Sequence, residues 1–412
     1  MRIGIVHPAF LHRGGAENLT LWLASGLAQR GHAVTLFAAG LALDQWPEID
    51  LAAVRTVELS DHRDDFWHEP SRSRQHGRII AEHGADADVL VCGIHPAHLW
   101  LSQALAVMPR PPASVLYCQE PRRKYYYMWT DRPTVAYVES GRRTLPFHDW
   151  LANGIRYRRR ASRLSKIPLA RWYDRRKLAR LERIVANSRF TAHNASRVWR
   201  RRVEVCYPGV PVPAAVTAPN PADRTGVAVL TGWEVAKNPM GVLGTINEVV
   251  HHFGRRDIPF TLTGRNIRPE YEAYLRDHDL SAVVSLRDYI SEEEKIALLR
   301  QARLCLFIPF AEPFGLVPVE AMLHHTPVIA ADHGGPSEVV VDGKTGRLVD
   351  VFAPREVARA VVELYDDANL LAEYGSAGER RAREEFSLDA LLDRFELQLR
   401  AACDEHVATM TA

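Results

Sequence analysis

Short apolar runs alternate along the chain with longer segments in which apolar residues recur at helical spacing. An apolar run at 3–7 predicts a first strand, and a glycine-containing loop follows it. The next segment, 18–30, places its apolar residues on one face of a helix and ends at Gly31. A second apolar run at 34–37 completes a β-α-β order, which is typical of a parallel sheet.

The same alternation continues through both halves of the chain. Further strands are predicted at 89–92, 114–117, 183–186 and 203–206, and then at 227–232, 260–263, 283–286, 304–309 and 328–331. Helical segments such as 292–302 lie between them. The pattern therefore predicts the α/β class, with two doubly wound parallel sheets. A length of 412 residues also favours two domains.

A proline-rich segment separates the two halves. Four prolines fall within 208–219, where they interrupt any helix or central strand. We therefore expect an N-terminal domain at 1–207, a linker at 208–224 and a C-terminal domain at 225–385. The remaining residues, 386–412, are predicted to be mainly helical.

Composition narrows the class of protein. A net charge of +2 and 47% hydrophobic residues are ordinary for a globular chain and exclude a general polycation. Five cysteines show no paired spacing, so neither a disulfide framework nor a cysteine metal site is predicted. The first apolar run resembles a strand more than a signal peptide, and no apolar run approaches the length of a membrane span. These features predict a cytoplasmic location.

The segment Glu312-Pro-Phe-Gly-Leu-Val-Pro-Val-Glu320 is the most informative part of the chain. It follows an apolar strand and leads into a helix whose first turn is predicted to hold Pro318 and Glu320. A strand that ends in a glycine turn at a helix N-terminus binds phosphate, because free N–H groups and the positive helix end face the ligand. A second such unit follows at 327–338. The layout predicts a nucleotide-linked substrate, although a glutamate in a first helical turn is also a common partner of the helix dipole.

These residues closely resemble the C-terminal domain of retaining glycosyltransferases of family four. The resemblance is carried by the segments 312–322, 326–330, 334–338 and 342–349. It implies the GT-B architecture, in which two Rossmann-like domains face a central cleft. It also implies that Glu312 lies by the donor sugar and Glu320 binds the ribose. The backbone amides of Phe314, Gly315 and Leu316 would bind the diphosphate.

The first half carries weaker matches to the same family. Gly14, Gly15 and Glu17 resemble the N-terminal loop that contacts the donor, although a plain tight turn remains an alternative. The loop is not the G-x-G-x-x-G fingerprint, so a nicotinamide site is disfavoured. The resemblance further implies that the final helix packs back on the first domain and that the first domain binds the acceptor.

Three further residues are candidates for the reaction. Lys237 follows a strand end and would neutralise the departing diphosphate. The family usually has an arginine directly after the preceding glycine, where this chain has Trp233, and Arg265 is a candidate substitute or else a surface arginine. Gln119 stands where mannosyltransferases often have a histidine by the donor sugar. A glutamine can form hydrogen bonds there but cannot carry a positive charge.

A basic segment at 155–183 holds twelve Lys or Arg residues against Asp174 and Glu182. Aromatic and aliphatic residues are interleaved with the charges. The segment predicts docking on an anionic membrane surface or binding of a phosphate-bearing acceptor, with a solvated helix face as the alternative. Nucleic acid is not expected as a partner, because no nucleic-acid-binding module accompanies the charge.

The predicted function is transfer of a hexose from a nucleotide sugar, with GDP-mannose favoured over a UDP-sugar. The predicted acceptor is a glycan or a polyprenyl-diphosphate-linked sugar, and the predicted location is the cytoplasm or the inner face of the membrane. No cofactor or metal is expected, because helix N-termini, Lys237 and the amides near Phe314 suffice for the diphosphate charge. A sugar-nucleotide 2-epimerase and a non-catalytic scaffold of the same fold remain alternatives.

Overall fold

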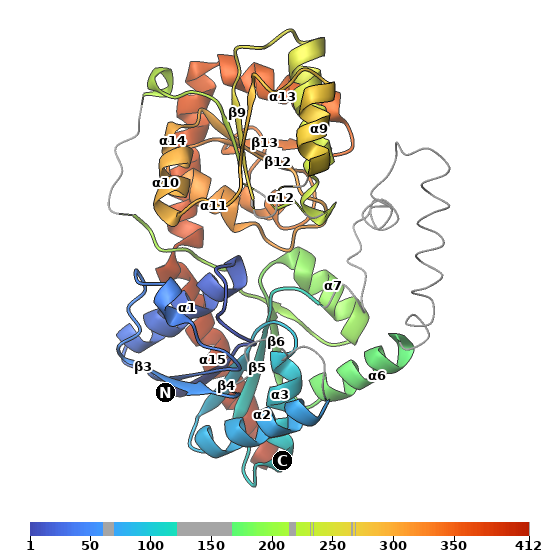
Figure 1. Cartoon of the computed structure of the whole chain (residues 1–412). Helices are drawn as coiled ribbons and strands as arrows, with labels where there is room; N and C mark the ends of the chain where they lie inside the picture. Colours follow the sequence, from blue (N-terminus) through green and yellow to red (C-terminus); the bar gives the residue numbers. More distant parts are fainter. Residues whose placement is uncertain are drawn as a thin grey trace. The chain divides into compact units, whose positions relative to one another are not determined.

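The computed structural model describes residues 1–60, 70–121, 167–213, 220–230, 232–233, 235–264, 267 and 269–411 (Figure 1). These residues form two compact units. Unit 1 contains the described residues up to 211 together with 388–411, and unit 2 contains those of 212–387. In the described parts of the chain, no helix is both long enough and apolar enough to cross a bilayer.

Unit 1 is built on a seven-stranded sheet with the order β3-β2-β1-β4-β5-β6-β7. All neighbouring strands are parallel. The strands are β1 (Arg2–Val6), β2 (Ala33–Ala38), β3 (Val54–Glu58), β4 (Val89–Cys92), β5 (Ala113–Cys118), β6 (Arg183–Ala186) and β7 (Glu204–Val205). The central strands β1, β4 and β5 are mostly apolar because helices cover both faces of the sheet.

The helices of unit 1 are α1 (Gly15–Gln29), α2 (Pro70–His83), α3 (Ala97–Val107), α6 (Ile167–Leu178), α7 (Arg189–Trp199) and α15 (Leu388–Thr411), with a short 3-10 turn η1 (Leu43–Gln45). Helices α1 and α15 share one core with Ile3 and Ile5 of β1. Helices α2 and α3 pack on the opposite face. The side chain of Ser188 caps α7 by accepting a hydrogen bond from Thr191 N, as its position before the helix predicts.

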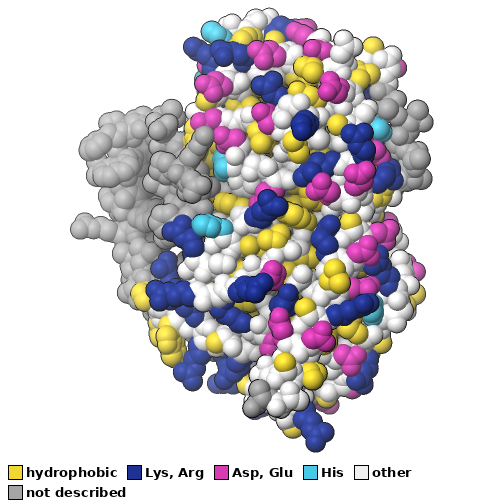
Figure 2. Space-filling model, turned by 180° about the vertical axis from the view of Figure 1, so that it is seen from behind, with side chains coloured by type: hydrophobic (Ala, Val, Ile, Leu, Met, Phe, Trp, Pro, Cys, Tyr) yellow, Lys and Arg dark blue, Asp and Glu magenta, His cyan; other side chains and the backbone are white. Residues whose placement is uncertain are grey.

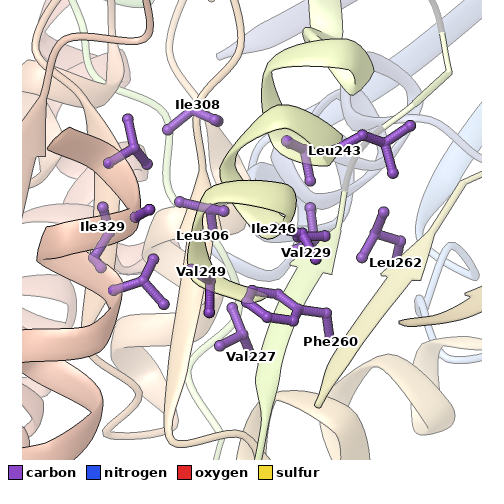
Figure 3. Close-up of a cluster of buried hydrophobic side chains, with 14 of the residues drawn as sticks. Val227, Val229, Leu243, Ile246, Val249, Phe260, Leu262, Leu306, Ile308 and Ile329 are labelled. Atoms are coloured by element: carbon purple, nitrogen blue, oxygen red, sulfur yellow. The ribbon is translucent and has the colours of Figure 1, made fainter. Parts of the chain in front are cut away.

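Unit 2 contains a six-stranded parallel sheet with the order β10-β9-β8-β11-β12-β13. The strands are β8 (Val227–Leu230), β9 (Phe260–Thr263), β10 (Val284–Arg287), β11 (Leu304–Phe307), β12 (Val328–Ala331) and β13 (Gly346–Val349). Figure 3 shows the buried cluster on one face, where Val229 and Leu306 of the sheet lie near Leu243 and Ile246 of a covering helix.

The helices of unit 2 are α8 (Pro239–Asn247), α9 (Pro269–Asp277), α10 (Glu292–Gln301), α11 (Leu316–Leu323), α12 (Pro336–Val339), α13 (Pro354–Asp366) and α14 (Ala368–Phe386). Shorter turns are η2 (Pro221–Asp223), η3 (Val235–Lys237) and the π-helical η4 (Glu248–His252). In both sheets the strand order reverses beside the first strand of the unit, at the boundaries β1/β4 and β8/β11. Ligands bind at the carboxyl ends of the strands at such a point. The predicted α/β class with two Rossmann-like sheets is confirmed.

Candidate functional site

Three loops meet at the carboxyl edge of the unit 2 sheet. The loop after β8 joins the loop after β11 through a hydrogen bond from Phe310 N to Ala236 O, of 2.8 Å. The loop after β12 joins the same segment through Gly335 N, which donates to Glu312 O at 2.8 Å. The two strand–glycine turn–helix units of the sequence are therefore in direct contact.

Two glycines make this contact sterically feasible. Gly334 has a φ of +73°, and a Cβ there would lie 2.7 Å from Glu312 O. A Cβ on Gly335 would lie 2.1 Å from the Cα of Phe314. Any side chain at Gly335 would displace the backbone that carries Glu312 and Phe314, so the paired glycines support the shape of the site.

The Phe-Gly-Leu turn leads directly into α11. Gly315 is the N-cap, with a φ of +93° that a glycine adopts without strain. Phe314 is buried, and its ring lies 5.6 Å from the ring of Phe386, which anchors the turn in the core. Leu316 and Val317 are the first helical residues, and N–H groups at such positions have no acceptor within the helix. The turn therefore has the backbone geometry of an anion site.

The start of α11 corrects one expectation. Because the helix begins at Leu316, Pro318 is its third residue and Glu320 its fifth, so Glu320 lies just beyond the first turn rather than within it. Pro318 is tolerated because no N–H of the first turn has an intrahelical acceptor to lose.

Glu312 forms an ion pair with Lys237. Lys237 Nζ lies 2.8 Å from Glu312 Oε2, and the two side chains are 34% and 14% exposed. The lysine ends η3 after β8, and the glutamate belongs to the loop after β11. The tertiary structure thus brings together the two residues that the sequence nominates for catalysis, which are 75 positions apart.

Glu320 forms a second ion pair, with Lys295 of α10. Lys295 Nζ lies 2.7 Å from Glu320 Oε1 and 2.7 Å from Glu292 Oε1. Lys295 is not among the site residues predicted from the sequence. The sequence does show a lysine directly after three glutamates, in the helix before β11. This pattern is also common in solvent-exposed helices, so it does not by itself indicate a site residue.

Trp233 contributes to packing and supplies no positive charge. It is buried, its Nε1 donates to Gly264 O at 2.6 Å, and its ring stacks on Tyr271 at 4.9 Å. The residue joins the loop after β8 to the end of β9. It therefore does not replace the arginine of the family pattern. The proposed substitute, Arg265, lies outside the described residues.

The carboxyl edge of the unit 1 sheet carries the other nominated residues. Gly14 is the N-cap of α1 and Gly15 its first residue, and a Cβ on Gly14 would lie 2.3 Å from Glu17 Oε2. Glu17 Oε1 is 3.7 Å from Nε2 of His7, a buried residue after β1 that is not among the predicted site residues. Gln119 follows β5 at the same edge and is half-buried.

Two histidines and one aspartate of unit 1 form a group that could hold a metal ion. The ligand atoms of His95, His98 and Asp174 all lie within 4.8 Å of one another. Such a set suits a transition metal rather than Mg²⁺. However, His98 Nε2 and Asp174 Oδ1 are 2.7 Å apart, which is a hydrogen-bond distance and shorter than the roughly 3.3 Å between two ligands of a tetrahedral zinc ion. The pair joins α3 to α6.

Helix α6 presents apolar side chains beside its basic ones. Leu169 and Trp172 are 65% and 55% exposed, and the Arg176 guanidinium lies 5.4 Å above the Trp172 ring. Elsewhere the charges are mixed: Figure 2 shows Lys and Arg interspersed with Asp and Glu over the face in view. The part of the basic segment before 167 lies outside the described residues.

Two family models match the chain. The model Glycosyltransferase Family 4 matches residues 13–212, and the model Glycosyl transferases group 1 matches residues 246–381. Together they cover well over half of the chain.

Curated relatives include mannosyltransferases. The chain is 36% identical over 125 residues to the alpha-1,3/1,6-mannosyltransferase ALG2 of Mus musculus, a match that covers 30% of each chain. It is 26% identical over 280 residues to the corresponding protein, alg-2, of Neurospora crassa, covering 57% of this chain and 59% of the relative. The chain thus matches less than two thirds of the length of either relative.

Solved structures share the fold over nearly the whole chain. Anabaena Alr3699/HepE, solved in complex with UDP-glucose, superposes with a TM-score of 0.72 at 15% identity and covers 97% of this chain and 100% of its own. A glycosyltransferase from Rickettsia africae superposes with a TM-score of 0.70 at 15% identity, over 97% and 98% of the two chains. With both halves matched by family models and the fold shared throughout, the chain belongs to the family-four, group 1 glycosyltransferases of the GT-B fold.

Proposed function

We propose that this protein transfers a hexose from a nucleotide sugar to a glycan or lipid-linked acceptor, with retention of the anomeric configuration. The observation that carries the proposal is the edge of the unit 2 sheet, where Glu312 and Glu320 flank the helix N-terminus at Gly315 and each pairs with a lysine. Charged and polar groups that converge on a strand-end helix suit a sugar linked to a diphosphate.

The donor would bind unit 2 in three parts. The diphosphate would contact the amides of Phe314, Gly315 and Leu316 at the start of α11. Glu312 would accept hydrogen bonds from sugar hydroxyls and Glu320 from the ribose. Lys237 would neutralise the charge that develops on the leaving diphosphate. These groups supply enough donors and positive charge that we propose metal-independent transfer.

In unit 1, we propose contacts to the donor from the loop at Gly14, Gly15 and Glu17 and from Gln119. All four lie at the carboxyl edge of one sheet. The same unit would bind the acceptor. Retention would follow attack of the acceptor on the face that the phosphate leaves, with the phosphate oxygen taking the acceptor proton. No covalent nucleophile is assigned.

The favoured donor is GDP-mannose. Its support is the similarity to mannosyltransferases and the Gln119-Glu-Pro-Arg sequence. A UDP-sugar is the second candidate, since a structural neighbour was solved with UDP-glucose.

A thermal-shift screen with GDP-, UDP- and ADP-sugars would identify the donor. Release of nucleoside diphosphate that depends on both donor and acceptor would support transfer, and proton NMR of the product would report the anomeric configuration. Conversion of a UDP-sugar without acceptor would instead indicate a 2-epimerase. Binding without any turnover would indicate a non-catalytic scaffold.

We further propose that the protein acts at the cytoplasmic face of an anionic membrane. Exposed Leu169 and Trp172 beside the arginines of α6 provide both apolar and electrostatic attraction to such a surface. Exchange of Trp172, Arg171 and Arg176 for alanine should reduce sedimentation with phosphatidylserine vesicles. A control for the loss of two positive charges replaces the exposed Arg359 and Arg380 of unit 2 by alanine. Equal sedimentation of both variants would contradict membrane docking through α6.

A further inference from the structure

Lys295 lies between two carboxylates at the edge of the candidate nucleotide site. Its Nζ is 2.7 Å from Oε1 of Glu320 on α11 and 2.7 Å from Oε1 of Glu292 on its own helix. The Lys295 and Glu320 side chains are only 16% and 14% exposed. Surface ion pairs contribute little, but this pair is largely shielded from water, so its geometry is constrained.

The charge of Lys295 is retained in this setting. Burial by itself lowers the pKa of Lys295, but the attraction of Glu320 and Glu292 and the hydrogen bonds to both outweigh it. The net result is a pKa above the ordinary lysine value. The ammonium group therefore donates to Glu320 Oε1 throughout the neutral range.

The helix that carries Lys295 is firmly held. A capping box fixes its start, because Ser291 and Glu294 exchange hydrogen bonds between side chain and backbone. The Lys295 amide donates to Ser291 O, in the first turn of the helix. A side chain on such an element can hold a partner more precisely than one on a loop.

Holding one carboxylate oxygen orients the other. With Oε1 engaged by Lys295, the lone pairs of Oε2 take a defined direction in which ribose hydroxyls can donate to them. A glutamate without such a partner would lose side-chain freedom on binding the ribose, at a cost in affinity. The ion pair of Glu312 differs from this one, because its lysine, Lys237, is 34% exposed and therefore more accessible to water than Lys295.

We propose that Lys295 is the positioning residue of a ribose-diol subsite, holding Glu320 so that the protein binds ribonucleotides in preference to nucleotides without ribose hydroxyls. This proposal rests on the proposed function, since it assumes that the ligand at this edge is a nucleoside diphosphate. It goes further by assigning a role to Lys295, a residue outside the Glu312–Glu320 segment.

Calorimetric titration with GDP and with 2′,3′-dideoxy-GDP tests the assignment, with UDP and its dideoxy analogue in parallel. K295M should weaken binding of the ribonucleotide about tenfold, the loss expected for one charge-assisted contact. The dideoxy analogue should bind wild type and K295M within about twofold. K295R should recover part of the loss. K295M added to E320A should cause no further loss, because the lysine acts through that glutamate.

Lys344→Met, at an exposed lysine of unit 2, is the matched control and should bind both nucleotides as wild type does. Weaker binding of both nucleotides by K295M would show general damage to the fold and would overturn the assignment, as would unchanged binding of the ribonucleotide. These outcomes leave the proposed function standing. A wild-type protein that binds none of the nucleotides would overturn the proposed function and this inference together.

Discussion

The two units share a parallel, doubly wound sheet but differ in the side chains at its carboxyl edge. In unit 2 the edge carries two lysine–glutamate pairs around a helix N-terminus and a close-packed glycine turn. In unit 1 the corresponding edge carries His7 beside Glu17 and His98 beside Asp174. The same architecture therefore presents a fixed array of charges in one unit and an array rich in imidazole in the other.

This difference indicates that the sheet supplies position and the loops supply chemistry. The edge of unit 2 is suited to a phosphorylated ligand, because it joins a helix N-terminus to ammonium groups and to carboxylate acceptors for hydroxyls. The edge of unit 1 instead pairs its carboxylates with histidines, at Glu17 with His7 and at Asp174 with His98. Four experiments test this contrast between the units, in order of decreasing expected effect.

Glu312→Ala should have the largest effect on turnover. The variant loses the proposed acceptor for the donor sugar and the 2.8 Å ion pair between Lys237 and Glu312. We expect turnover to fall about 100-fold or more, within the range seen when a preorganised polar group is removed. Binding of free nucleotide should change less than about twofold. Steady-state kinetics measures turnover, and calorimetry measures the binding of free nucleotide. Glu17→Ala is the corresponding variant of unit 1. Full turnover in Glu312→Ala would remove this residue from the site.

Glu320→Ala should act on nucleotide affinity. Loss of the carboxylate removes the proposed acceptor for the ribose, and it removes the ion pair of Lys295 with Glu320 while that with Glu292 remains. The expected loss is about 1–3 kcal/mol of binding free energy, as for a hydrogen-bonded group left without its partner. Isothermal titration with the donor's nucleoside diphosphate measures it directly. Unchanged affinity would refute the ribose role.

Each unit contains a buried histidine that should make its stability sensitive to acid. Burial, followed by the charge of Arg72, lowers the pKa of His76 in unit 1 to about 4. Burial, followed by the charges of Arg300, Arg224, Lys295 and His325, lowers the pKa of His324 in unit 2 to about 4. Both histidines bind protons more weakly when folded. Their contribution to stability is therefore complete above about pH 6.5 and falls as the pH drops towards 4.

Urea unfolding at pH 7 and pH 5 measures this acid sensitivity. Each histidine should account for a loss of about 1–2 kcal/mol in the free energy of unfolding between the two pH values. His76→Gln should flatten the pH dependence of unit 1 and His324→Gln that of unit 2. If both variants keep the wild-type pH dependence, other groups are responsible for it.

Removal of metal ions should have the smallest effect. If Lys237 and the start of α11 compensate the diphosphate charge as proposed, EDTA should change turnover by less than about twofold. The assay is turnover before and after dialysis against chelator. A large loss that added zinc restores would contradict metal independence, and it would direct attention to His95, His98 and Asp174 of unit 1.

The order of the elements and the core of the unit 2 site followed from local sequence. Apolar runs predicted strands at β1, β8 and β11, because a strand buried on both faces needs several consecutive apolar residues. The segment around Gly315 predicted a glycine turn before a helix, because few residues other than glycine adopt its φ of +93°. Only the helix start was misplaced, since Pro318 is acceptable at several positions of a first turn.

The partners of individual side chains could not be predicted from local sequence. Lys295 is 25 residues from Glu320, and His98 is 76 from Asp174, so no local periodicity relates either pair. Trp233 occupies an arginine position of the family pattern, and only its contacts with Gly264 and Tyr271 show that it is a packing residue. Backbone propensity acts over a few residues and can be recognised in the sequence. Ion pairs and ring contacts depend on which elements lie side by side in the folded chain, so they become visible only in the three-dimensional structure.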